Sequence, residues 1–151
     1  MRNTNEMELI FDSRSANERF ARVAVAAFMT QLNPTVEEVS DVKTAVSEAV
    51  TNAIIHGYEQ EVHKVSMHCR IDGDLLFVTI KDTGKGIADV AQAMMPMYTS
   101  KPEADRSGMG FSFMEAFMDK VMVESAPGQG TSVFMEKRIG KGRSLWTTQS
   151  L

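Results

Sequence analysis

The sequence predicts an α+β fold, a two-layer sandwich in which helices cover one face of a mixed, mostly antiparallel sheet. Three patterns lead to this prediction: a long helical repeat of apolar residues in the first third of the chain, a strand hairpin after it, and two short strands near the end. A chain of 151 residues suits one domain with a proper core. We therefore expect a single domain over residues 1–138 and a flexible tail over residues 139–151.

The first part of the domain is expected to hold one strand and two helices. Residues 7–11 are predicted to form the first strand, and Ser15 or Asn17 can cap a helix that runs to about Leu32. Residues 35–38 (TVEE) have the pattern of a capping box, in which a threonine and a glutamate satisfy each other's backbone N–H groups. This box predicts the start of a long second helix.

The remaining part is expected to hold four strands and another helix. Residues 65–71 alternate apolar and polar side chains, which is typical of a half-exposed strand. Asp72-Gly73 predicts a hairpin turn into an apolar strand at 75–81. A helix is expected from Gly108 to about Asp119, followed by strands at 121–125 and 131–137.

Composition excludes several classes of function. The net charge is −4 and the isoelectric point is near 5.4, whereas nucleic acids and membranes are generally bound by basic surfaces. No apolar run approaches the length that spans a membrane. The single cysteine, Cys69, has no partner for a disulfide and is expected to be a small buried hydrophobe. We expect a cytoplasmic protein whose partners are proteins, with no direct contact to nucleic acid or membrane.

The stretch at 48–57 (EAVTNAIIHG) is the most informative one in the chain. At about 100° per residue, Glu48, Asn52 and His56 share one flank of the second helix, opposite the valines of its core side. Such a stripe can be an ordinary solvated face. The residues that surround it are, however, small or apolar: Ala45, Ala49 and Ile55. We therefore expect this flank to be covered rather than open to solvent.

Two glycine clusters supply an independent signal. The first, at 82–86 (DTGKG), directly follows a predicted strand, where glycine permits a sharp turn and a close approach of backbone to a ligand. The second, at 107–110 (SGMG), opens a helix, and the free N–H groups of a helix start suit phosphate. Each cluster taken alone has a plainer interpretation, a surface turn for the first and a flexible hinge for the second.

Neither cluster matches the P-loop or the dinucleotide fingerprint. The order of motifs is a helix with Glu and Asn, then Asp-x-Gly-x-Gly, then a long connection, then Gly-x-Gly, with a late GQGT at 128–131. This order resembles the ATP-binding module shared by gyrase, Hsp90, histidine kinases and MutL-type proteins. The resemblance covers roughly residues 8–137 and implies a Bergerat-type ATP-binding fold, with Asn52 as the asparagine of the N-box.

Three segments carry a more specific resemblance: residues 47–58 (SEAVTNAIIHGY), 99–103 (TSKPE) and 106–111 (RSGMGF). They resemble the anti-sigma factors of endospore-forming bacteria. This resemblance implies a serine-protein kinase that sequesters a sporulation sigma factor of RNA polymerase and phosphorylates a serine of its anti-anti-sigma antagonist. It also implies a homodimer, and ATP and Mg²⁺ as the ligands.

The resemblance assigns roles to individual residues. Asn52 would bind Mg²⁺ through its amide oxygen. By its position one turn earlier on the same flank, Glu48 is placed to take a proton from an incoming serine or a water, with a solvent-facing charge as the alternative. Asp82 would accept a hydrogen bond from the adenine amino group, Gly86 would let the base approach, and Thr131 would help close that pocket. Further contacts to ATP are expected from the remaining residues of the two clusters and of the segment before the second one: Gly84, Lys101, Ser107, Gly108, Met109 and Gly110.

Two arginines are expected to act outside the base pocket. Arg106 abuts the second cluster and is expected to serve the terminal phosphate as a catalytic residue, although exposed charges such as Arg106 and Lys101 are often only solvated. Arg22 matches a first-helix motif of the same family and is expected to bind the sigma factor, with a plain exposed charge as the alternative. The segment 88–107 between the clusters is long for a connection, which favours a lid.

Other interpretations compete with a serine kinase. A histidine kinase carries its phosphoacceptor on a separate helical hairpin, which this sequence does not show, and a gyrase-like ATPase needs a transducer domain, for which we expect no room. A binding module from another class, in which ATP only switches sigma-factor binding and nothing is phosphorylated, stays open.

Overall fold

The computed structural model describes residues 2–95 and 110–140. Within them, five strands form one sheet in the order β1-β2-β3-β5-β4, and every ladder is antiparallel. The strands are β1 (Thr4–Asp12), β2 (Lys64–Asp72), β3 (Leu75–Asp82), β4 (Lys120–Ser125) and β5 (Thr131–Arg138). The predicted α+β sandwich is confirmed. The described sheet has no parallel pair, although the sequence had suggested a mixed one.

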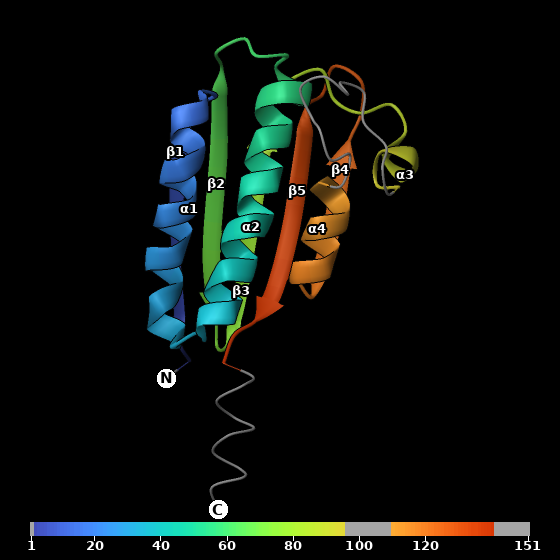
Figure 1. Cartoon of the computed structure of the whole chain (residues 1–151). Helices are drawn as coiled ribbons and strands as arrows, with labels where there is room; N and C mark the ends of the chain where they lie inside the picture. The colour runs from blue at the N-terminus through green and yellow to red at the C-terminus, as the bar shows by residue number, and fades with distance from the viewer. Residues whose placement is uncertain (1, 96–109, 141–151) are drawn as a thin grey trace, which may run out of the picture.

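The principal helices lie on one face of this sheet (Figure 1). They are α1 (Ser15–Met29), α2 (Val36–Asn52), the short α3 (Val90–Ala93) and α4 (Gly110–Phe117), with a 3-10 turn at Thr30–Leu32 and a π-helical turn at Ala53–Gly57. α2 lies between α1 and α4 and packs against both, whereas α3 lies beside β4 (Figure 1). In the described part of the chain, no helix combines the length and the apolar composition that crossing a bilayer requires.

The core lies between the sheet and the helices. The inward side chains of β2 are completely buried, and so are the valines on the core side of α2: Val65, Met67, Cys69, Ile71, Val42, Val46 and Val50. The alternating pattern that predicted β2 is therefore the pattern of burial. Cys69 is a buried hydrophobe as expected, and burial raises the pKa of its thiol to about 12, so the thiol stays protonated at neutral pH.

The two long helices begin in different ways. The capping box of α2 is confirmed, because the Glu38 backbone N–H donates to the Thr35 hydroxyl (3.1 Å) and the Thr35 N–H donates to the Glu38 carboxylate (2.8 Å). The predicted cap of α1 by Ser15 or Asn17 is wrong. The residue before α1 is Arg14, which provides no side-chain cap, and the Asn17 amide donates instead to the backbone oxygen of Asp12 (2.9 Å).

Glu38 also anchors the chain where it leaves the sheet. The Gly140 N–H donates to the Glu38 carboxylate (2.9 Å), and Ile139 is buried with 3% of its surface exposed. The chain thus stays packed on the domain for two residues beyond the predicted boundary at 138. The rest of the predicted tail, residues 141–151, lies outside the described residues.

Replacing Glu38 with alanine is expected to lower the free energy of unfolding by about 2–3 kcal/mol, because the Thr35 and Gly140 N–H groups both lose their acceptor. Denaturant unfolding measures the loss. The matched control is Glu37→Ala, which removes an exposed carboxylate from the same helical turn and is expected to cost under about 0.5 kcal/mol. Equal losses in the two variants would show that only the helix dipole is at work.

Candidate functional site

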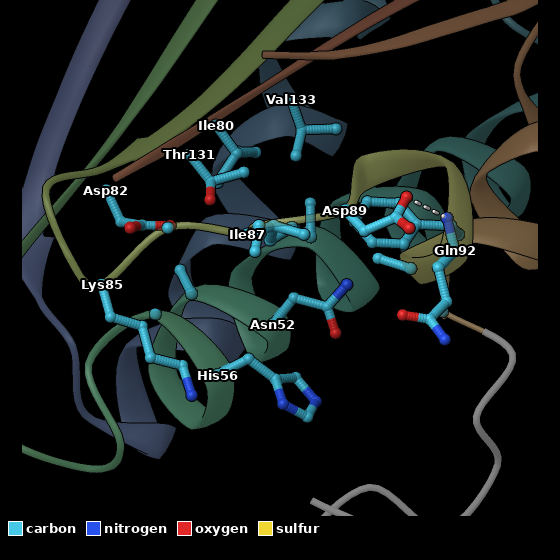
Figure 2. Close-up of a pocket in the computed structure, with 18 residues that line it drawn as sticks. Asn52, His56, Ile80, Asp82, Lys85, Ile87, Asp89, Gln92, Thr131 and Val133 are labelled. Carbon is cyan, nitrogen blue, oxygen red and sulfur yellow. Dashed lines mark hydrogen bonds between the residues drawn. The ribbon is translucent and has the colours of Figure 1, made fainter. Parts of the chain in front are cut away.

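A cavity of about 320 Å³ lies between α2, the facing ends of β3 and β5, and the segment that follows β3. Apolar side chains form much of its wall: Ala49, Ala53, Ile80, Ile87, Ala93, Phe111 and Val133. The polar side chains that line it come from several elements: Asn52, His56, Asp82, Lys85, Asp89, Gln92 and Thr131 (Figure 2). A mostly apolar hollow with a few converging polar groups is the usual form of a small-molecule site.

Asp82 marks one end of the cavity. It is the last residue of β3 and has only 6% of its surface exposed. Its carboxylate accepts a hydrogen bond from the Gly84 N–H (2.9 Å) and another from the backbone of Thr131. Burial raises the pKa of the Asp82 carboxyl above its usual value, and these two donors partly oppose that shift. Such a carboxylate suits a flat ligand that brings an N–H donor into an apolar slot.

The first glycine cluster is required by backbone packing. A Cβ atom on Gly84 would lie 2.1 Å from the carbonyl oxygen of Gly57, and one on Gly86 would lie 1.9 Å from that of Ala126. Gly86 also has a φ of +76°, which strains any other residue. Of the two predicted ligand contacts, Gly86 lines the cavity, whereas Gly84 does not and instead brings the loop against the end of the helix.

Gly130 has a positioning role that was not predicted from the sequence. Its φ is +74°, and a Cβ atom there would lie 2.2 Å from the backbone oxygen of Asp82. The GQGT motif contained this signal, but the contact that explains it joins residues that are distant in the sequence. Gly130 thus brings the start of β5, with Thr131, against the end of β3.

Tyr58 is a second residue with a positioning role that was missed. It is 6% exposed, its hydroxyl donates to the backbone oxygen of Lys64, and it accepts from the Thr83 N–H (2.8 Å). It therefore fixes the loop immediately after Asp82. A tyrosine at the end of an apolar helix face was the available signal, because a buried hydroxyl needs a partner.

Tyr58→Phe is expected to lower the free energy of unfolding by about 1–2 kcal/mol, because the Thr83 N–H and the Lys64 carbonyl each lose their hydrogen-bond partner, the hydroxyl of the buried Tyr58. Phenylalanine keeps the ring contact with His63, whose centroid lies 4.9 Å away, so the change isolates the hydroxyl. Thermal unfolding monitored by circular dichroism measures the effect. An unchanged midpoint would mean that water replaces the hydroxyl at no cost.

The other end of the cavity is formed by α2 and the start of α4. A Cβ atom on Gly110 would lie 3.2 Å from the Asn52 amide nitrogen and 3.4 Å from a Glu48 carboxylate oxygen. The Glu48 carboxylate, the Asn52 amide and Gly110, the last residue of the second glycine cluster, therefore converge. The Asn52 amide extends from α2 into the cavity (Figure 2). α4 also supplies the expected cover for this flank, since Ala45 and Ala49 are buried.

The predicted regular helix changes its period within the N-box. The Tyr58 N–H bonds to the Ala53 carbonyl, a five-residue step that makes a π-helical turn. Such turns are rare and frequent at functional sites. His56 sits in this turn and still lines the cavity with Asn52 (Figure 2).

The chemistry of the end formed by α2 and α4 fits a hard cation held jointly with a ligand. Amide and carboxylate oxygens are suitable donors for Mg²⁺. Among residues 2–95 and 110–140, no group of three or more His, Cys, Asp or Glu side chains could hold a metal alone. A cation beside Asn52 and Glu48 would therefore need further oxygens, such as those of a bound phosphate.

Several predicted site residues lie outside the described residues: Lys101, Arg106, Ser107, Gly108 and Met109. Of the predicted lid, residues 88–95 are described and include α3, whose first turn is capped by Asp89 through the Gln92 N–H (3.0 Å). Arg22 lies on α1 and does not line the cavity. Its Nε is 3.0 Å from the carboxylate of Glu18, which also accepts a hydrogen bond from the Ser47 hydroxyl.

Comparison with known proteins agrees with this fold. The model of the histidine kinase-like ATPase domain family matches residues 11–137, which gives the class of the protein. Relatives named anti-sigma F factor are 56% identical in Oceanobacillus iheyensis (94% of this chain, 98% of the relative) and 52% identical in Thermoanaerobacter pseudethanolicus (95% and 100%). The chain belongs to the anti-sigma F factor family within that class, and the resemblance seen in the sequence is confirmed.

Solved structures show the same fold at low identity. The RsbU and RsbW domains of a Mycobacterium tuberculosis protein align with a TM-score of 0.64 and 17% identity, over 89% of this chain and 32% of that one. The histidine kinase domain of a blue-light activated kinase from Erythrobacter litoralis aligns with a TM-score of 0.53 and 17% identity, over 82% and 62%. These similarities support the architecture alone.

Proposed function

We propose that the chain is an ATP-dependent protein-serine kinase and anti-sigma factor, which sequesters a sporulation sigma factor and phosphorylates a serine of its anti-anti-sigma antagonist. The observation that carries the proposal is one cavity with two chemically different ends. A buried carboxylate, Asp82, lies at one end, and Glu48 and Asn52 meet the start of α4 at the other. An adenine nucleotide has two matching ends, a flat ring that carries an amino group and, beyond the ribose, the phosphates.

The base end would recognise adenine by shape and by one hydrogen bond. The apolar wall packs on both faces of a flat ring, and the Asp82 carboxylate accepts from the exocyclic amino group. Thr131, paired in register with Asp82 across β3 and β5, closes this end. Guanine carries a carbonyl where adenine carries the amino group, so it would place one acceptor against another.

The phosphate end would position and deprotonate the attacking hydroxyl. The Glu48 carboxylate takes the serine proton as the hydroxyl oxygen bonds to the γ-phosphorus, and the bond between that phosphorus and the bridging oxygen breaks to release ADP. The N–H groups at the start of α4 face the phosphates, where the helix dipole is positive. When bound, Mg²⁺ supplies positive charge beside the phosphate oxygens, and the Asn52 amide oxygen is the group of this chain that would hold it. Arg106, Lys101 and residues 107–109 are proposed to complete this end.

The remaining parts of the proposal concern partners and organisation. Arg22 on α1 is proposed to contact the sigma factor, and the chain is proposed to act as a cytoplasmic homodimer. The kinase domain is proposed to span residues 1–138, with the segment from 139 to 151 as its tail. The family membership supports the sigma-factor partner, because the relatives at 52–56% identity carry anti-sigma F factor as their name.

Incubation with labelled ATP, Mg²⁺ and a purified anti-anti-sigma protein tests the reaction. The label is expected on the partner, stable in acid and lost in strong base, which is the behaviour of phosphoserine. Phosphohistidine would show the reverse stability and would indicate a histidine kinase reaction. Absence of label from both proteins, with ATP bound, would favour the ATP-switched binding module.

A further inference from the structure

Lys85 is the one permanently cationic side chain that lines the cavity in the described part of the chain. It comes from the base-end loop, three residues after Asp82, and Figure 2 shows it running along the cavity toward the helix end that carries His56. Its backbone is fixed on both sides: the Lys85 N–H donates to the Gly57 carbonyl (2.9 Å), and the Lys85 carbonyl accepts from the Gly128 N–H (2.6 Å). The origin of the side chain is therefore well defined.

Glu59 forms an ion pair with the Lys85 ammonium. The Lys85 ammonium lies 3.4 Å from the Glu59 carboxylate, and both side chains are about half exposed. Glu59 has a φ of +51°, a conformation that non-glycine residues adopt at a cost, in the turn that follows the π-helical segment. A second hollow of about 440 Å³ shares Gly57 and Lys85 with the cavity, and Glu59 lines this second hollow. Lys85 is thus held at the boundary between the two hollows.

We propose that Lys85 binds the α-phosphate of the nucleotide and that Glu59 restrains it by holding it in an ion pair when no nucleotide is bound. This inference rests on the proposed function. With the base at Asp82 and the terminal phosphates at Asn52 and Gly110, the ribose and α-phosphate would lie between these two ends, in the cavity that Lys85 also lines. An anionic phosphate is a stronger partner for an ammonium than a ribose hydroxyl is.

The proposal predicts opposite effects for the two partners. Lys85→Met keeps the aliphatic stem and removes the charge, so the dissociation constant for ADP is expected to rise about fivefold to tenfold. Glu59→Gln releases Lys85 from competition, so ADP is expected to bind about twofold to fivefold more tightly. The double variant is expected to behave like Lys85→Met, because the gain from Glu59→Gln requires the lysine.

Calorimetric titration with ADP and with adenosine tests this at fixed ionic strength. Adenosine has no phosphate, so its affinity is expected to be the same, within about twofold, in all four proteins. An equal loss of ADP and adenosine binding in Lys85→Met, or weaker ADP binding in Glu59→Gln, would overturn the role of Lys85. Normal ADP binding by the wild type with unchanged variants overturns this inference alone. A wild type that binds neither ADP nor ATP overturns the proposed function as well.

Discussion

Glu48→Gln is expected to slow phosphate transfer by about 10²–10⁴-fold while leaving ATP binding within a few-fold of the wild type. The Glu48 carboxylate lies beside Gly110 and close to Asn52, at the end of the cavity where the γ-phosphate would lie. Glutamine has the same shape and can still donate and accept hydrogen bonds, but it cannot take the proton of the incoming serine. The loss should therefore fall on the chemical step. Single-turnover transfer from labelled ATP, with calorimetry of nucleotide binding, separates the two quantities.

A control on the same helix shows whether the effect belongs to the site. Glu37 lies eleven residues before Glu48, about three turns of α2, and so projects in a similar direction. It is exposed at the far end of the helix. Glu37→Gln is expected to leave transfer unchanged. Should Glu48→Gln also transfer phosphate at the wild-type rate, Glu48 is not the base, and a search for another acceptor of the serine proton must follow.

The alternative function predicts a different pattern. If ATP only switches sigma-factor binding, neither the wild type nor Glu48→Gln labels the anti-anti-sigma protein, and sigma-factor capture depends equally on ATP in both. A kinase instead shows transfer in the wild type only, with capture retained in the variant. The pair of measurements therefore discriminates between an enzyme and a binding module.

The elements that the sequence predicted well are those whose signals are local. The two-residue alternation in β2 reports one buried and one open face, and Asp72-Gly73 supplies the turn conformation, with Gly73 at a φ of +67°. The capping box of α2 is likewise complete within four residues. The motif order also indicated that Asn52, Asp82 and Gly110 belong to one site, and these residues do line one cavity.

The features that were missed depend on contacts between distant segments. The Gly130 contact with Asp82 and the Tyr58 bonds to Lys64 and Thr83 exist only once β3, β5 and the helix end have packed together. The π-helical turn adds one residue to a helical period and has no composition of its own. Neither predicted residue caps α1, because Ser15 already lies in the first turn and Asn17 bonds to Asp12 instead. The residue at the cap position is Arg14, whose side chain provides no cap. Helix and strand propensities alone do not predict these contacts, the π-helical turn or the missing cap.

Asp82→Asn is expected to weaken ATP and ADP binding by about 100-fold or more without destabilising the nucleotide-free protein at neutral pH. The carboxylate accepts from the Gly84 and Thr131 backbones. We expect its remaining acceptor capacity to face the adenine amino group. If the asparagine oxygen keeps the backbone bonds, its NH₂ group meets the amino group donor to donor, and a buried site built for one hydrogen-bond pattern strongly rejects the mismatched one.

The stability of Asp82→Asn relative to the wild type is expected to depend on pH, and the direction of this change follows from proton linkage. Burial raises the pKa of the Asp82 carboxyl in the folded state, so between the unfolded and folded pKa values the native protein binds more protons than the unfolded chain. This contribution to stability is complete below the unfolded pKa and is lost as the pH rises through the folded one. Asparagine carries no such charge, so the variant should gain stability relative to the wild type as the pH rises through that window.

Denaturant unfolding at a series of pH values, upward from the usual aspartate pKa of about 4, measures this difference, and thermal shift with ADP measures binding. Asp89→Asn is the matched control, because it removes a carboxylate from the same cavity while asparagine can still cap α3. We expect ADP to raise the melting temperature of the wild type and of Asp89→Asn but not of Asp82→Asn. A nucleotide response that survives in Asp82→Asn would mean that shape and phosphate contacts, rather than this carboxylate, select the base.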